Sequence, residues 1–158
     1  MKIYLAAPYG SRATVAAYAD ELRSIGITVT SSWLAETHDI TPGTEGAATA
    51  LSDEQVAEHA HTDLREVRDS DLLVLFTAAS VGTEGGGGRH VETGMALALD
   101  KPVLVVGEPE NVFHRMGPRY VFTFPDWHAT VLDLARRYAG RHQNVDARRL
   151  CETSTDAR

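Results

Sequence analysis

A glutamate that follows a run of glycines is the residue in this sequence best suited to chemistry. Glu92 comes shortly after Gly85 to Gly88, where consecutive glycines let backbone amides approach a ligand and the start of a helix favours an anion. A carboxylate that faces a ligand pocket can attack an anomeric carbon and form a covalent glycosyl-enzyme. A glutamate in the first turn of a helix can also merely stabilise the helix dipole. The spacing alone leaves both interpretations open.

Two more side chains are candidates for the same site. Asp63 lies on the helix expected before the central strand, and it could protonate a leaving group or be a solvated acid. Tyr4 lies on the first strand, where its phenol could hydrogen-bond Glu92 and orient it. A buried core tyrosine explains Tyr4 equally well. Trp33 follows the second strand and could stack on a ring or cover the edge of the core.

The sequence offers no motif for a cofactor or a metal ion. The glycine run lacks the Gly-Lys-Ser/Thr of a Walker A loop, and it is not the Gly-x-Gly-x-x-Gly that follows the first strand of a dinucleotide fold. Cys151 is the only cysteine, which excludes an internal disulfide and disfavours a Cys-based zinc site. The histidines do not form the pair with a neighbouring acid that zinc hydrolases use; those considered are His59, His61, His90 and His114. We therefore expect neither metal nor cofactor.

Length and charge indicate one cytoplasmic domain with a small-molecule ligand. The 158 residues are 43% hydrophobic and 23% charged, which suits a single globular core, and no apolar run is long enough to cross a bilayer. The N-terminus lacks the features of a signal peptide, so we expect a cytoplasmic protein with no membrane partner. The net charge of −7, without a basic stripe, argues against binding a nucleic-acid polymer.

Apolar runs alternate with helical patterns along the chain. Helices are expected from Ser11 to Gly26, from a capping box at Ser52 to Asp69, from Arg89 to Asp100 and from Trp127 to Ala139. Strands are expected at Lys2–Ala6, Ile27–Thr30, Asp71–Phe76, Pro102–Val106 and Val121–Phe124. This order predicts a doubly wound α/β fold with a mostly parallel five-stranded sheet, Rossmann-like or flavodoxin-like.

In such a sheet, ligands bind outside the carboxyl ends of the strands. We therefore expect the chemistry in three loops: residues 6–10, the long connection from residue 31 to about 51, and a flexible stretch at 77–88. The helix after that stretch is expected to bury a stripe beside which Glu92 lies, formed by Val91, Met95, Ala98 and Leu99. The helix before the central strand is expected to have an apolar side, formed by Ala57, Ala60 and Leu64.

Three short segments together resemble the nucleoside 2-deoxyribosyltransferases and their relatives, the 2′-deoxynucleoside 5′-monophosphate N-glycosidases. The segments are residues 2–7 (KIYLAA), Asp63-Leu64 followed by residues 71–74 (DLLV), and residues 88–103 (GRHVETGMALALDKPV). Each is short, but their order and spacing are fairly specific. The resemblance implies one catalytic domain at residues 1–140. Residues 141–158 are polar and rich in Arg and Asp, so we expect a flexible tail there.

The resemblance also implies roles for individual residues. Glu92 matches the nucleophile that attacks the sugar C1′, Tyr4 the tyrosine that holds it, and Asp63 the aspartate that helps proton transfer to the base. Asn111, with Phe113, matches a region that completes the site of a neighbouring subunit, which implies a homodimer or higher homo-oligomer. The positions expected to contact substrate are Ala7, Pro8, Tyr9, Trp33, Gly86, Gly88, Arg89, His90, Asn111 and Phe113.

The sequence departs from the family at two places. Gly86 occupies the position of an acidic base-contacting residue of the transferases, whereas Pro8 and Gly10 occupy positions where the N-glycosidases hold phosphate with a hydroxyl and an arginine. Residues that could compensate for the phosphate contacts are Ser11, Arg12, Arg89, His90, His114 and Arg115.

Four functions therefore remain in view. Transfer of a (2′-deoxy)ribosyl group between nucleobases is favoured slightly, because Asn111 suits a nucleoside 5′-hydroxyl. The second function is hydrolysis of a (deoxy)nucleoside 5′-monophosphate. The third is that of a phosphoribohydrolase of the lysine-decarboxylase-like type, whose Pro-Gly-Gly-x-Gly-Thr-x-x-Glu motif this sequence matches only in part. The fourth is a nucleotide-binding module without catalysis.

Overall fold

Five parallel strands form one sheet in the order β2-β1-β3-β4-β5. The computed structural model describes residues 1–36, 51–82, 87–137 and 139. The strands are β1 (Lys2–Ala6), β2 (Thr28–Val29), β3 (Leu72–Phe76), β4 (Val103–Val106) and β5 (Val121–Phe124). This is the strand order of the flavodoxin-like doubly wound folds, so the predicted fold class is confirmed. The tail at 141–158 lies outside the described residues.

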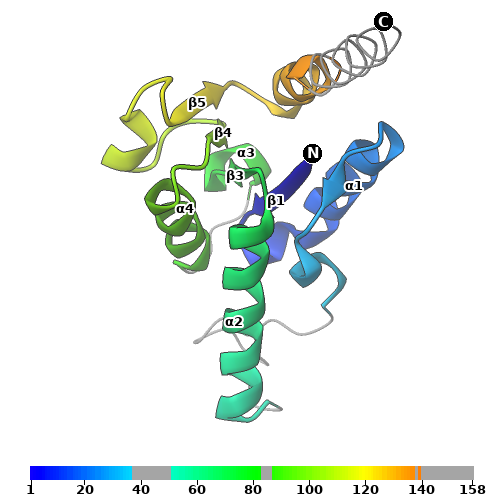
Figure 1. Cartoon of the computed structure of the whole chain (residues 1–158), viewed down its shortest axis with the longest axis vertical. Coiled ribbons are helices and arrows are strands. Elements are labelled where there is room, and N and C mark those ends of the chain that lie inside the picture. The colour runs from blue at the N-terminus through cyan, green and yellow to red at the C-terminus, as the bar shows by residue number, and fades with distance from the viewer. Residues whose placement is uncertain (37–50, 83–86, 138, 140–158) are drawn as a thin grey trace, which may run out of the picture.

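Helices cover both faces of this sheet (Figure 1). On one face, α2 (Asp53–Asp69) packs against α4 (Gly88–Ala98). On the other face lie α1 (Arg12–Ser24) and a C-terminal helix at 127–137, which the stacked rings of Tyr18, Phe76 and Trp127 join to β3. Short helical segments follow the strands: η1 (Tyr9–Ser11), η2 (Ser32–Ala35), α3 (Ala78–Val81) and η3 (Val112–Arg115). Within the described residues, no helix is long and apolar enough to span a membrane.

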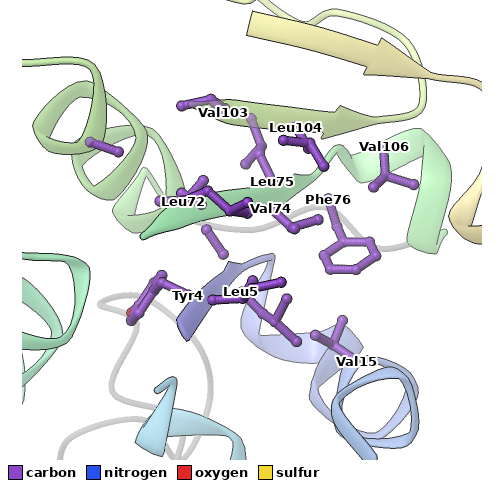
Figure 2. Packing of buried hydrophobic residues seen from close by; sticks show 14 of the residues in the cluster. Tyr4, Leu5, Val15, Leu72, Val74, Leu75, Phe76, Val103, Leu104 and Val106 are labelled. Carbon is purple, nitrogen blue, oxygen red and sulfur yellow. The ribbon is translucent and has the colours of Figure 1, made fainter. Parts of the chain in front are cut away.

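Alternation along the buried strands decides which side chains face which helices. All residues of β3 and β4 are buried, as expected for central parallel strands covered on both faces. Figure 2 shows Leu5 and Phe76 directed toward Val15 of α1, whereas Tyr4 points away from that helix. Successive strand residues point to opposite faces, so Tyr4 is directed to the face covered by α2 and α4. Its side chain is completely buried there.

The capping box at the start of α2 forms as predicted. The Ser52 side chain accepts from the Gln55 backbone N–H, and the Gln55 side chain accepts from the Ser52 backbone N–H. Ser11 occupies the N-cap position of α1, where the helix was expected to start, but its hydroxyl donates to the Pro8 carbonyl and makes no capping bond to the helix. The stretch expected to be a flexible loop after β3 contains the helical turn α3.

The predicted buried stripe of α4 was wrong. Val91 is 65% exposed and Leu99 41% exposed, whereas the buried residues of the helix are Arg89, Thr93 and Ala96. The physical reason is that the buried polar groups are satisfied. The Thr93 hydroxyl donates to the Arg89 carbonyl, and the Arg89 guanidinium pairs with Glu110. A stripe defined only by apolar residue type therefore misplaces the inner face of this helix.

The apolar side expected on α2 is also mostly exposed. Ala57 and Ala60 are exposed and Leu64 is half-buried, whereas Val67 near the end of the helix is buried. The N-terminal half of α2 extends away from the sheet, as Figure 1 shows, so alanines there have no core to pack against. The inner half of α2 brings Asp63 close to Tyr4 of β1.

Candidate active site

Tyr4 and Glu92 meet between β1 and α4. The Tyr4 hydroxyl donates to Glu92 Oε1 at 2.8 Å, across 88 positions of sequence. Since α4 begins at Gly88, Glu92 lies beyond the first turn, where interaction with the helix dipole has weakened. The carboxylate is half-buried and bonded to a core side chain, which favours a site residue over a residue that only stabilises the helix.

Asp63 reaches the same place from α2. Its carboxyl group interacts with the Tyr4 hydroxyl and with the charge of Glu92. Two carboxyl groups and a phenol from three separate elements therefore converge at one point. The structure thus brings together the three residues predicted as catalytic; their roles in a reaction remain predictions.

Burial shifts the pKa values of Glu92 and Asp63. Burial raises the pKa of Glu92 to about 8, and the nearby charges of Asp63 and Glu66 raise it further, while the hydrogen bond from Tyr4 lowers it. Burial also raises the pKa of Asp63 to about 6; the Tyr4 bond and His59 lower this value, and Glu36 and Glu66 raise it. With these two values, the pair of carboxyl groups holds about one proton near neutral pH.

Tyr4 stays protonated throughout this range. Burial, followed by the charges of Glu92 and Asp63, raises the pKa of its phenol far above its ordinary value. A tyrosine that keeps its proton is a permanent donor toward the carboxylate. It orients Glu92 and stabilises the ionised form of that carboxyl group.

The loop residues predicted to bind substrate lie at the carboxyl edge of β1 and β2. Ala7, Pro8 and Tyr9 follow β1 directly, and the Tyr9 and Trp33 ring centroids are 6.3 Å apart. Trp33 is only 7% exposed, and its indole N–H donates to the Leu5 carbonyl at 2.8 Å. These contacts agree with the interpretation that Trp33 covers the core edge; stacking on a base remains a prediction.

The other predicted substrate residues form a separate cluster on the opposite side of α4. His90 is two positions from Glu92, so its side chain leaves the helix in nearly the opposite direction. His90 Nε2 lies 3.6 Å from Glu110 Oε2, and His90 Nδ1 lies 3.4 Å from the Asn111 amide nitrogen. Arg89 is buried and pairs with Glu110 at 3.2 Å. Arg89 and His90 therefore meet at Glu110.

The segment after β4 holds the rest of that cluster. Asn111 begins η3, where its Oδ1 accepts from the backbone N–H of Phe113 and of His114. Phe113 is 60% exposed. It lines an apolar hollow of about 400 Å³ between α4 and η3 with His90, Thr93, Gly94, Leu97, Asn111 and Met116. Gly88 is the first residue of α4, and Gly86 lies outside the described residues.

Several charged residues near the site were missed by the sequence analysis. Glu66 accepts from the Ser32 backbone N–H at 2.9 Å, and Glu36 pairs with His59 Nδ1 at 2.8 Å. His59, Asp63 and Glu66 are spaced at helical intervals, so their common face on α2 was a usable signal. Glu36 and Glu110 meet partners 21 to 23 residues away, and no local pattern indicates such contacts. Among the described residues, no group of three or more His, Cys, Asp or Glu side chains could hold a metal ion.

Comparison with known proteins places the chain in a fold class. Neither a family model nor a curated protein matches the sequence. A 2-deoxyribosyltransferase from Bacillus psychrosaccharolyticus is 23% identical, with a TM-score of 0.56 over 81% of this chain and 88% of its own. A CMP N-glycosidase from Clostridium botulinum is 16% identical, with a TM-score of 0.52 over 85% of this chain and 98% of its own. The fold implied by the sequence resemblance is thereby confirmed: the chain has the α/β architecture of these proteins.

Proposed function

We propose that the protein cleaves the N-glycosidic bond of a (2′-deoxy)nucleoside and transfers the sugar to another nucleobase through a glycosyl-Glu92 intermediate. The observation that carries this proposal is the bond from Tyr4 to Glu92, with Asp63 beside it. Two structures of the same fold point the same way, since one is named a 2-deoxyribosyltransferase and the other a CMP N-glycosidase. A non-catalytic module has no evident need for two half-buried carboxyl groups of raised pKa.

The proposed reaction is a double displacement at the anomeric carbon. The Glu92 carboxylate attacks C1′, the bond from C1′ to the base nitrogen breaks, and its electron pair leaves with the base. In the reactive form of the pair, Glu92 is ionised and Asp63 carries the proton, which Asp63 gives to the departing base. An acceptor base then attacks C1′, releases Glu92 and returns a proton to Asp63. Two inversions give net retention at C1′.

A Glu92 substitution tests this proposal directly. Purified protein incubated with a panel of deoxynucleosides and their 5′-monophosphates should release free base, measured by liquid chromatography. Glu92→Ala should lower the rate by about 10³-fold or more, because the nucleophile is lost. Glu92→Gln is the matched variant of similar shape. Equal rates in the parent and Glu92→Ala would contradict the assignment of the nucleophile. Ligand binding without base release in the parent would favour a binding module.

Hydrolysis of a nucleoside 5′-monophosphate is the second candidate. The observation that favours it is Arg12, which begins α1 beside Tyr9 at the carboxyl edge of β1; its guanidinium lies 5.8 Å from the Tyr9 ring centroid. A cation at this edge suits a phosphate. Adding a second base to the reaction separates the two functions. A new nucleoside supports transfer, whereas free base alone, from monophosphates only, supports hydrolysis.

We further propose that the active protein is a homo-oligomer in which the Asn111 region completes the neighbouring site. Asn111 and Phe113 lie beyond the far side of α4 from Glu92 of their own chain, so they can contact that chemistry only from another subunit. The apolar surface around the hollow suits a subunit contact, since Val91, Val112, Phe113 and Met116 are all exposed.

A further inference from the structure

A second recess lies beside the proposed catalytic residues, between η2 and the outer half of α2. Its volume is about 450 Å³. The residues lining this outer cleft are Ser32, Ala35, Glu36, Gln55, Glu58, His59 and Thr62. Thr62 of its lining precedes Asp63 on α2, and the charges of Glu36 and His59 act on the Asp63 carboxyl group. It opens beyond the carboxyl edge of β2, which is where ligands bind in folds of this class.

An acid and a histidine face each other across this outer cleft. His59 Nδ1 lies 2.8 Å from Glu36 Oε1, and the side chains are 34% and 19% exposed. Because a carboxylate only accepts hydrogen bonds, the Nδ1 atom carries the hydrogen of this contact. The bond occupies one of the roughly four acceptor positions of the carboxylate, so Glu36 retains capacity to accept from a ligand.

The backbone around Glu36 is fixed from several directions. The Tyr9 hydroxyl donates to the Glu36 carbonyl at 3.4 Å, and Arg12 donates to the Leu34 carbonyl at 3.2 Å. At the start of η2, the Ser32 N–H donates to Glu66 at 2.9 Å. A group that is held before a ligand arrives loses little freedom on binding, so it can discriminate between similar ligands.

The position of the pair matches the far edge of a nucleobase. His59 precedes Asp63 by four residues on α2, which is about one turn, or roughly 5.4 Å, along the helix. This inference rests on the proposed function, which places the glycosidic nitrogen of the substrate near Glu92 and Asp63. The ring of a base extends over a similar distance, so its outer edge would reach Glu36 and His59.

We propose that Glu36, held by His59, accepts a hydrogen bond from the exocyclic amino group of the nucleobase and so determines which bases are used. A carboxylate attracts an amino group and repels a carbonyl oxygen at the same position. The preferred substrates would carry cytosine or adenine, whose amino groups stand where uracil and hypoxanthine have a carbonyl oxygen. Uracil, thymine and hypoxanthine have no exocyclic amino group. A site built around one hydrogen bond rejects an analogue that lacks the donor, because its own polar group is then left unpaired.

A substrate pair that differs only at this group tests the proposal. The ratio of kcat/KM for deoxycytidine over deoxyuridine, or for the 5′-monophosphates if these are the substrates, should exceed about tenfold in the parent. Glu36→Gln keeps the shape and supplies a donor for a carbonyl oxygen, so the ratio should fall by about tenfold or more. Asp20→Asn is the matched control. Asp20 is an exposed acid on α1, outside the cleft, and pairs with Arg23 at 2.8 Å, so its loss should leave the ratio unchanged.

Each outcome decides between this inference and its alternatives. If Glu36 and His59 only clamp η2 to α2, Glu36→Gln would lower kcat/KM for both substrates alike, and the inference would be wrong. A parent that uses uracil as readily as cytosine would also overturn it. If the parent releases base from no nucleoside or nucleotide, the proposed function fails together with the inference. Calorimetric titration with free cytosine and free uracil gives a second readout, in which Glu36→Gln should lose the preference for cytosine.

Discussion

The hydroxyl of Tyr4 contacts Glu92 from within the hydrophobic core, so one residue both packs in the core and hydrogen-bonds the proposed catalytic carboxylate. The ring of Tyr4 is completely buried among the strands, and its hydroxyl is 2.8 Å from Glu92 Oε1. Of the influences on the Glu92 pKa, this hydrogen bond is the one that lowers it, against burial and two neighbouring carboxyl groups. The fraction of Glu92 that is ionised therefore depends on Tyr4.

Tyr4→Phe should preserve the packing and raise the pKa of Glu92 above its present value of about 8. The reaction needs ionised Glu92, so the ascending limb of the kcat/KM profile should move to higher pH. The rate at neutral pH should fall about 10- to 100-fold, which is the effect of losing one hydrogen bond to a charged group. The measurement is kcat/KM from pH 5 to 9.5.

Tyr18→Phe is the matched control, because Tyr18 is stacked on Phe76 on the other face of the sheet. Its pH profile should equal that of the parent. An unshifted profile in Tyr4→Phe would show that the hydroxyl does not tune Glu92.

Among the individual residues of the site, some contacts could be predicted from the sequence. The types and order of Tyr4, Asp63 and Glu92 predicted a shared location, and the structure brings them together. The partners of Glu36 and Glu110 were not predictable, because loops fold back over the sheet to bring them into contact. A charged residue in a loop carries no periodic signal that identifies its partner.

Among the secondary-structure elements, strands were easier to predict than the inner faces of helices. The apolar runs located β1, β3, β4 and β5 to within a residue, since buried parallel strands contain little else. The inner face of α4 was mispredicted because it buries Arg89 and Thr93. Whether a polar residue can be buried depends on partners elsewhere in the fold, and here the partner of Arg89 is Glu110.

The turn after β4 packs tightly against α3 through Gly107. This residue has φ +95°, and an added Cβ would lie 2.4 Å from Thr77 Oγ1 and 2.7 Å from Ser80 Cβ. Gly107→Ala should therefore lower the free energy of unfolding by about 3 kcal/mol, from backbone strain together with overpacking. Chemical denaturation followed by circular dichroism measures the change.

Gly94→Ala provides the control, because nothing lies within 4 Å of an added Cβ at this exposed helical position. It should leave stability unchanged or raise it slightly, since alanine favours helices over glycine. Equal stability of the two variants would contradict the steric account of Gly107.

For the whole molecule, the proposed site is divided between two surfaces of α4. Glu92 lies toward α2 and β1, while Asn111 and Phe113 lie beyond the opposite side. The strand order that creates this division follows the expected flavodoxin-like arrangement. An assembly of subunits could not be derived from the strand pattern, because it depends on surface shape.

Complementation between two variants would detect a shared site. Asn111→Ser keeps a capping oxygen at the start of η3 but loses the amide, and we expect it to be inactive, as is Glu92→Ala. Co-expressed at equal levels, the two should form mixed oligomers in which some sites contain both native residues. Random pairing into dimers predicts about a quarter of the parental activity.

Size-exclusion chromatography with light scattering gives the matching oligomeric state. A monomer, or mixed oligomers without recovered activity, would contradict the shared site.

The burial of Tyr4 limits which residues of the proposed site can change in evolution. The groups that hold Glu92 belong to the sheet and to α4, where any change disturbs the core. The side chains that line the outer cleft come from η2, its end at Glu36 and the outer half of α2, and none of them belongs to the buried core. Under the proposed function, descendants of this sequence can therefore acquire new base preferences by exchanging cleft residues, while Glu92 and the Tyr4 hydroxyl that supports it stay unchanged.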